Sequence, residues 1–148
     1  MVEDYKGKTL AVSGGFDPIH VGHLNMFEQA KELVGPSGRL IVFVNSDDFL
    51  IKKKGRQFMP LEDRMRLISA MKIVDEVFAV VDKDQSVCET LRKYKPDIFA
   101  NGGDRNLGNI PEAAVCKELG IKMIFNIGGE KVRSSSRFLE KYSKSEKY

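Results

Sequence analysis

The sequence contains no tryptophan, only two cysteines in 148 residues, and no long apolar run. Cys88 and Cys116 stand alone, without the CxxC spacing of a zinc or redox motif, so we expect two reduced thiols and a cytoplasmic location. The longest strongly apolar run, 40–44, is far too short to span a membrane, and the N-terminal residues lack the pattern of a signal peptide. We therefore expect no membrane partner.

A large excess of one charge sign is also missing. The 24 basic and 21 acidic residues leave a net charge of +3, which is too mild to indicate a nucleic-acid partner. Positive charge is concentrated in KKKGR (52–56) and KVRSSSR (131–137). The length fits a single domain over residues 1–148, with a polar, frayed tail over about 141–148.

Strand-like and helix-like stretches alternate along the whole chain. The strand-like stretches are 9–14, 39–47, 76–81, 97–103 and 122–127, and the helical ones begin near Val21, Pro60, Ser86, Pro111 and Ser134. Such alternation is typical of a parallel sheet with helices on both faces. We therefore predict an α/β fold, a single Rossmann-like domain with a five-stranded parallel sheet.

Polar loops follow four of these predicted strands. SGGFD follows the first strand, NSDD the second, NGGD the fourth and GGEKVRSSS the fifth. In sheets of this kind, ligands bind beyond the carboxyl ends of the strands, where the strand order reverses. The sequence therefore predicts one binding site built from these four loops.

Both histidines of the chain lie in the ten-residue stretch GGFDPIHVGH (14–23). His20 and His23 are three residues apart at the start of a predicted helix, so they share one face beside the positive end of the helix dipole. Free backbone N–H groups at such an end bind phosphate, and two imidazoles would add donors. Three glycines are expected to make room for a ligand or between the rings: Gly14, Gly15 and Gly22.

The same stretch is also compatible with two other roles. The histidines could be satisfied within a turn, or Asp17, His20 and His23 could hold a metal ion. A zinc site needs further ligands at a recognisable spacing, and no other histidine or suitably placed cysteine occurs. In the phosphate-binding interpretation, Asp17 would either hold metal or orient His20.

HVGH lies within the longer pattern G-x-F-D-x-x-H-x-G-H, and VNSD, KKKGR, PLEDRM, VDEV, PDIFANGGD and RSSSR follow it in order. In these motifs the chain resembles the HxGH nucleotidyltransferase superfamily of cytidylyltransferase-like enzymes. It is most similar to the adenylyltransferase domain that activates heptose 1-phosphate, and nearly as similar to glycerol-3-phosphate cytidylyltransferase. The resemblance implies transfer of NMP from ATP or CTP to a small phosphorylated sugar or alcohol, with release of pyrophosphate and with Mg²⁺ as cofactor.

Nucleotidyl transfer requires alignment of two substrates and neutralisation of charge on the phosphoryl oxygens. The expected catalytic residues are His20, His23, Lys54 and Arg64. The histidines would contact the α-phosphate and the leaving pyrophosphate. Lys54 belongs to the basic segment 52–56, which either is a solvated loop or closes as a lid hinged at Gly55. Arg64 flanks the inward stripe of a predicted helix and would reach the edge of the site, unless it is a surface residue.

The resemblance also implies a set of nucleotide-binding residues. The loop 101–104 would lie against the nucleobase and ribose, mainly through backbone atoms, with a plain turn as the alternative. The serines 134–136 would offer hydroxyl and N–H groups to the β- and γ-phosphates, unless they only cap a helix. The complete set is Gly14, Gly15, Phe16, Asp17, Gly22, Asn101, Gly102, Gly103, Asp104, Arg133, Ser134, Ser135 and Ser136.

Two positions depart from the family pattern. Gly15 replaces the usual threonine, serine or cysteine, which removes one phosphate contact, and Arg133 replaces an apolar or small residue. The segment VDEV (74–77) resembles a block used for dimer contacts in the glycerol-phosphate enzymes, which implies a homodimer.

Three alternative functions are also open. FMN is a phosphomonoester, so the same chemistry would serve adenylyl transfer from ATP to FMN. A non-catalytic nucleotide-binding module would have lost a histidine or the basic residues, and all of these are present. A metal-dependent hydrolase would bind zinc tightly and stoichiometrically.

Overall fold

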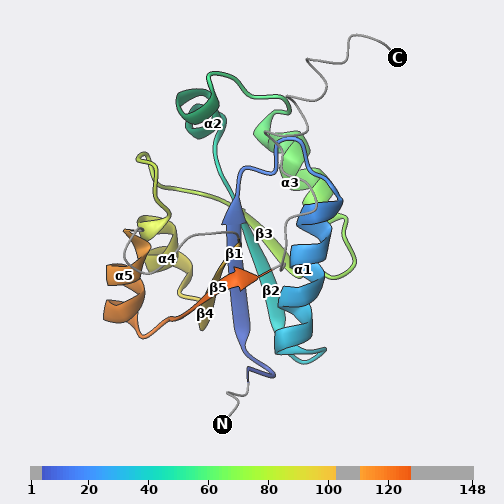
Figure 1. Ribbon diagram of the computed structural model, residues 1–148, viewed down its shortest axis with the longest axis vertical. Coiled ribbons are helices and arrows are strands. Elements are labelled where there is room, and N and C mark those ends of the chain that lie inside the picture. Colours follow the sequence, from blue (N-terminus) through green and yellow to red (C-terminus); the bar gives the residue numbers. More distant parts are fainter. Residues whose placement is uncertain (1–4, 103–110, 128–148) are drawn as a thin grey trace.

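The computed structural model describes residues 5–102 and 111–127, and five parallel strands form one sheet in this part of the chain (Figure 1). The strands are β1 (Thr9–Gly14), β2 (Arg39–Val44), β3 (Glu76–Ala79), β4 (Ile98–Gly102) and β5 (Lys122–Ile127). Their order is β3-β2-β1-β4-β5. The chain moves outward from β1 to β3 and then returns to the other side of β1, so the strand order reverses between β1 and β4. The predicted α/β fold is confirmed.

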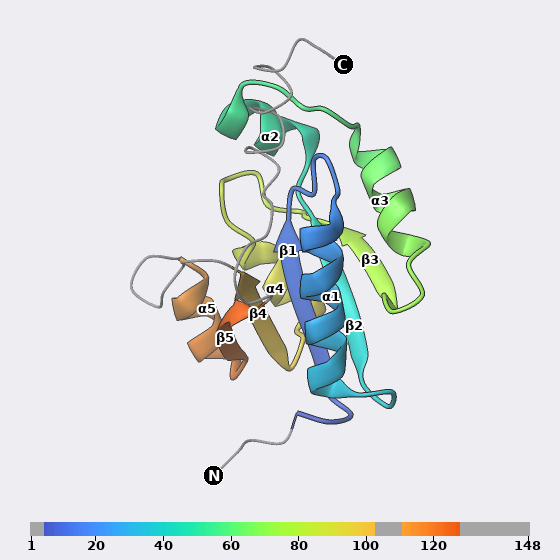
Figure 2. The ribbon, with the colours of Figure 1, turned by 45° about the vertical axis from the view of Figure 1, so that its right-hand side comes forward.

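Helices cover both faces of the sheet, as predicted. α1 (Val21–Val34) and α3 (Leu61–Ser69) pack on one face, and α4 (Cys88–Tyr94) and α5 (Glu112–Leu119) pack on the other. Figures 1 and 2 show these two layers, and both views place α2 (Asp47–Lys54) beyond the carboxyl end of β1.

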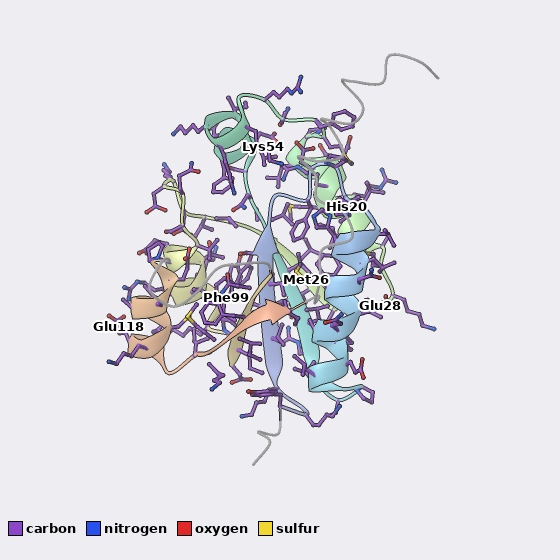
Figure 3. All side chains as sticks on the ribbon, viewed as in Figure 1. His20, Met26, Glu28, Lys54, Phe99 and Glu118 are labelled. Atoms are coloured by element: carbon purple, nitrogen blue, oxygen red, sulfur yellow. The ribbon has the colours of Figure 1, made fainter. Side chains whose placement is uncertain are left out.

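Alternation of side chains along the strands builds a core on each face. Leu10 and Val12 pack with α1 and α3, whereas Ala11 packs with α4 and α5. Phe43 and Phe99 belong to the second core, and Figure 3 shows Phe99 on the side of α4 and α5. Burial on both faces explains why these strands are nearly continuous apolar runs.

The boundaries of α1 agree with the sequence prediction. The helix begins at Val21, and its residues Phe27, Ala30 and Val34 are buried. Gly35 ends it with a φ of 72°, and the N–H of Gly35 donates to the Lys31 carbonyl. A positive φ of this kind favours glycine, which explains the stop.

The basic segment 52–56 was predicted incorrectly as a loop, because its three lysines form the last turn of α2. The hydroxyl of Ser46 caps the first turn by accepting from the N–H of Phe49, and two aspartates follow it. Gly55 ends the helix with a φ of 84°. The preceding strand was predicted to reach Asp47, which instead opens α2.

Smaller differences concern element ends. Pro60, predicted at the first helical position, caps α3 from outside the helix, and the strand predicted over 76–81 ends at Ala79. The helix predicted from Ser134 and the tail 141–148 lie outside the described residues. Among the described residues, no helix is long and apolar enough to cross a membrane.

Both cysteines are free, as predicted. Burial raises the pKa of the Cys116 thiol to about 11, and the charge of Glu112 adds to the rise. Burial likewise raises the pKa of Cys88. Neither thiol is therefore an activated nucleophile.

Candidate active site

The loop after β1 is shaped by the protein's own side chains. A Cβ atom on Gly14 would lie 2.9 Å from Cζ of Phe16, and one on Gly15 would lie 2.7 Å from Cδ2 of Leu50 in α2. These distances are shorter than real Cβ contacts, so each glycine admits a side chain of the protein. The room that was predicted for a ligand is taken by Phe16 and Leu50.

Phe16 supports the histidine pair from within the core. Its side chain is buried, and its φ of 52° lies in the left-handed region that residues other than glycine rarely adopt. The ring meets that of His23 edge to face at 5.0 Å and that of Phe27 at 5.4 Å. Phe16 was predicted to bind nucleotide, but it packs against His23 instead of lying open.

His20 and His23 cap α1 with their own rings. Nδ1 of His20 accepts a hydrogen bond from the N–H of Gly22 at 3.0 Å, and Nδ1 of His23 accepts one from the N–H of His20 at 3.1 Å. The two rings stack with their centroids 3.9 Å apart. Because a backbone N–H can only donate, each Nδ1 carries a lone pair, and the proton of each neutral ring is on Nε2.

This reciprocal cap corrects the prediction of free N–H groups at the start of α1. The N–H of Gly22 donates to the His20 ring, and the N–H of His23 donates to the His20 carbonyl at 3.0 Å. Two of the first backbone donors of the helix are thus already used by the protein. Gly22, a predicted nucleotide ligand, contributes its N–H to the cap.

Asp17 is buried and holds the segment between α2 and α3. Its carboxylate oxygens accept from the N–H groups of Phe58 and Met59, each at 2.5 Å. The sequence left two roles open for Asp17, metal binding and orientation of His20, and these contacts support neither. Asp17 instead connects the loop between β1 and α1 (residues 15–20), called the histidine loop below, to residues 58 and 59.

Arg64 lies inside the protein at the carboxyl edge of the sheet. Its side chain is 0% exposed, so the alternative of a surface arginine was wrong. The guanidinium donates four hydrogen bonds. Nε donates to Met59 O (2.9 Å), Nη1 to Gly15 O (2.8 Å) and Asn45 O (2.7 Å), and Nη2 to Asp47 Oδ1 (2.7 Å). Arg64 therefore joins the loops after β1 and β2 to the start of α2.

Lys54 is a half-buried cation at the end of α2. Burial lowers the pKa of its ammonium group below the ordinary value, the charge of Asp17 opposes this, and the charge of Arg64 adds to it. The ammonium group therefore lies within the field of the histidine loop. Figure 3 shows Lys54 and His20 at the same end of the molecule, beyond the strands.

Two buried asparagines flank β1 at the same edge. Asn45 follows β2 and donates its backbone N–H to the Gly14 carbonyl at 2.9 Å, and Asn101 lies in β4 beside Gly102. Asn101 and Gly102 were predicted to bind nucleotide. Asn45 was given no role in the sequence prediction, and the available signal was an amide directly after the five apolar residues 40–44.

Five of the predicted site residues in the described ranges have ionisable side chains, and the structure brings these to one edge: Asp17, His20, His23, Lys54 and Arg64. Six others lie outside the described residues: Gly103, Asp104, Arg133, Ser134, Ser135 and Ser136. Within the described ranges, no group of three histidine, cysteine, aspartate or glutamate residues is placed to hold a metal ion. The metal site of Asp17, His20 and His23 therefore gains no support.

The fold and the site together define a class of protein. A parallel sheet whose order reverses beside β1, with two imidazoles capping the first helix, is the arrangement expected of an HxGH nucleotidyltransferase. The family model described as cytidylyltransferase-like matches residues 11–137. The chain belongs to this cytidylyltransferase-like family, as its motifs predicted.

The chain is similar to proteins of two kinds. The chain is 35% identical over 101 residues to a FAD synthase from Methanopyrus kandleri, covering 68% of this chain and 66% of the relative. It is 38% identical over 116 residues to a bifunctional protein HldE from Streptomyces coelicolor, covering 77% of this chain and 24% of the relative. The chain thus spans about two thirds of the first relative and about a quarter of the second.

A solved structure supports the fold. The lipopolysaccharide core biosynthesis protein from Thermoplasma volcanium has a TM-score of 0.68 and 24% sequence identity, covering 85% of this chain and 98% of that protein. At this identity the similarity extends to the arrangement of the sheet and helices, and the site must be argued from the residues of this chain.

Proposed function

We propose that this protein transfers a nucleotidyl group from a nucleoside triphosphate to a phosphorylated small molecule. An oxygen of the acceptor phosphate attacks the α-phosphorus of the nucleotide. The bond from that phosphorus to the oxygen bridging to the β-phosphate breaks, and pyrophosphate leaves with that oxygen. No protein nucleophile takes part, so the work of the protein is to align two anions and offset their charge.

The paired imidazoles of His20 and His23 are the observation that carries this proposal. Their Nδ1 atoms accept from backbone N–H groups, so the neutral rings have Nε2–H groups as donors for phosphoryl oxygens. The two rings restrict each other by stacking at 3.9 Å, and the ring of His23 also packs against Phe16. Preorganised donors of this kind stabilise charge that grows in the transition state.

Lys54 is the proposed cation for the phosphates. Its half-buried ammonium group loses less interaction energy to solvent screening than a fully exposed lysine would. Asp17 and Arg64 are proposed to act indirectly, because their described hydrogen bonds go to protein groups that position the histidine loop and α2. Arg133 and the serines 134–136 remain proposed phosphate ligands.

Mg²⁺ is the proposed cofactor. It prefers oxygen ligands and usually combines substrate phosphates and waters with one or two carboxylates. The carboxylate of the histidine loop, Asp17, is already occupied by two backbone N–H groups, so the described residues do not form a protein cage for the ion. Entering with the triphosphate, Mg²⁺ would supply further neutralisation of phosphate charge.

ATP is the proposed donor, and FMN is the first candidate acceptor. The name FAD synthase implies joining of an adenylyl group to FMN, and this chain covers about two thirds of that relative but only about a quarter of HldE. A sugar phosphate of the heptose 1-phosphate type is the second candidate, because the similarity to HldE extends over 77% of this chain. CTP with glycerol 3-phosphate is the third combination.

A pyrophosphate-release assay tests these combinations. ATP and CTP are each supplied with Mg²⁺ and with FMN, heptose 1-phosphate or glycerol 3-phosphate, and the nucleotide-linked product is identified by mass. We expect release with ATP and one acceptor. Nucleotide binding without release for any pair would favour the non-catalytic module, and tight stoichiometric zinc in the purified protein would favour the hydrolase.

We also propose a homodimer, and light scattering of the purified protein decides this point. Two residues of the segment 74–77, Val74 and Asp75, make contacts within the domain. Val74 is buried in the core, and Asp75 accepts from the N–H of Leu40 and from Lys31, each at 2.7 Å. The dimer contact that the resemblance implies would therefore use the rest of this segment.

A further inference from the structure

The segment 55–60, which joins α2 to α3, is fixed against the histidine loop through its backbone. The N–H groups of Phe58 and Met59 donate to the two carboxylate oxygens of the buried Asp17, each at 2.5 Å. The carbonyl of Met59 accepts from Nε of Arg64 at 2.9 Å. The backbone at position 58 is therefore held in place by the loop that leads to the histidine pair.

The side chain of Phe58 is open to solvent although its backbone is fixed. It is 61% exposed, the highest value among the large apolar side chains that the structure describes. Single apolar residues on a surface are common, so the exposure alone indicates little. Its position distinguishes Phe58, because the hydrogen bond to Asp17 places an exposed aromatic residue at the rim of the candidate active site.

Val21 adds a second exposed apolar side chain beside the histidine loop. It follows His20 directly at the start of α1 and is 47% exposed. The polar groups of Asp17 and Arg64, in contrast, already bond to groups of the protein. Apolar side chains attract flat or apolar parts of a ligand and form no hydrogen bonds with hydroxyl groups.

An acceptor in nucleotidyl transfer has a phosphate that reaches the α-phosphorus and a remainder that extends away from it. The attacking and leaving oxygens lie roughly in line, so the acceptor approaches opposite the pyrophosphate, and its remainder extends toward the rim. In FMN this remainder is a ribityl chain that ends in the flat isoalloxazine ring system, whereas in a sugar phosphate it carries hydroxyl groups. An exposed phenyl ring favours the flat ring system, because aromatic rings stack on one another.

We propose that Phe58 is a specificity-determining residue that stacks against the flat ring system of a heteroaromatic acceptor such as FMN. This inference rests on the proposed function for the existence of a phosphorylated acceptor, and it selects FMN over a sugar phosphate or glycerol 3-phosphate. The contact lies on the surface of the segment 55–60, so it requires no enclosed pocket.

The test measures acceptor binding apart from catalysis. The full chain is saturated with α,β-methylene-ATP, which cannot release pyrophosphate, and FMN is titrated by fluorescence anisotropy. Phe58→Ala should weaken FMN binding ~5–50-fold, the value of one stacked aromatic ring, whereas Phe58→Tyr keeps the ring and should bind FMN as the wild type does. Leu67→Ala removes a 47% exposed apolar side chain from α3 and should leave FMN affinity unchanged.

The affinity for α,β-methylene-ATP itself, measured by calorimetry, is the reference for each variant. Phe58→Ala should leave this affinity unchanged, and equal losses for FMN and the nucleotide would overturn the inference, because Phe58 would then only shape the loop. FMN binding at wild-type strength in Phe58→Ala, or in Phe58→Leu, which has apolar bulk without a ring, would also overturn it. A wild type that does not bind FMN has the same consequence.

The outcomes separate this inference from the proposed function. Pyrophosphate release with a sugar phosphate, in a protein that does not bind FMN, would leave the proposed function standing and remove the role of Phe58. FMN binding that depends on Phe58 without pyrophosphate release for any acceptor would leave the stacking contact and remove the transfer activity. The ring of Phe58 is mostly exposed, so its variants should melt with the wild type.

Discussion

Replacement of Arg64 by lysine tests whether this residue holds the site together or contacts a substrate. The guanidinium reaches four acceptors, on Met59, Gly15, Asn45 and Asp47. A lysine ammonium has three donors at a single point and lacks the planar fork of arginine. It therefore leaves at least one of these acceptors unpaired, and two where the acceptors lie on opposite sides of the guanidinium.

The expected loss of stability follows from these contacts. Each buried acceptor left without a donor costs roughly 1–3 kcal/mol, so Arg64→Lys should cost ~2–4 kcal/mol. The ion pair with Asp47 adds little, because that carboxylate is 37% exposed and partly screened by water. In a protein of this size about 1 kcal/mol corresponds to roughly 2–4 °C, so Tm should fall by ~5–15 °C.

Scanning calorimetry of the wild type, Arg64→Lys and Arg66→Lys measures this effect. Arg66 is exposed on the same helix, so its variant provides the matched control and should melt with the wild type. ATP affinity is then measured below the transition of each protein. An Arg64→Lys variant that melts like the wild type but binds ATP weakly would refute the structural role and return Arg64 to the substrate-contacting role predicted from the sequence.

Three further predictions concern the histidines, Lys54 and Asp75. Alanine at His20 or His23 should lower kcat by ~10²–10⁴ with a smaller change in ATP affinity, and a variant that keeps half of the wild-type kcat would exclude that histidine from the mechanism. Because the pKa of Lys54 is lowered, its ammonium group loses its charge at high pH, and ATP affinity should fall as pH rises toward 10. Lys54→Arg should abolish this loss of affinity. Wild-type ATP affinity that stays constant over this pH range would contradict the role of Lys54. Burial raises the pKa of Asp75, but hydrogen bonds from Lys31 and a backbone N–H outweigh it and hold the pKa below its usual range. Ionised Asp75 therefore stabilises the fold above about pH 4, and this contribution is lost as pH falls further. In urea unfolding, Asp75→Asn should have a lower free energy of unfolding than the wild type at pH 7, and the difference should be much smaller at pH 3.

The parts of the site that were predictable are those encoded by neighbouring residues. The spacing of His20 and His23, the start of α1 and the order of strands and helices follow from local periodicity and from residues that begin and end helices. Predicting that the polar loops after β1 and β2 lie at one edge needed only the rule that parallel strands end together.

The parts that were missed depend on contacts between distant residues. Asp17 bonds to residues 41 and 42 positions away, and Arg64 reaches a carbonyl 49 positions away, which no local pattern reveals. The helix that ends in three lysines was missed because only Leu50 is buried in it, so it lacks an apolar stripe. Its capping residues, Ser46 and Gly55, were the available signal.

The contact between Gly15 and Leu50 links two positions that are 35 residues apart in the sequence. A serine or threonine at position 15 would place its Cβ 2.7 Å from Cδ2 of Leu50, so the leucine side chain would have to turn away or α2 would have to move outward together with Lys54. Adding a Cβ at position 15 alone would therefore weaken the packing of Leu50, whereas Gly15→Ser combined with Leu50→Ala would restore the space. In an alignment of relatives, these two positions should change together, with a bulky residue at 50 accompanying glycine at 15 and a smaller one accompanying threonine or serine.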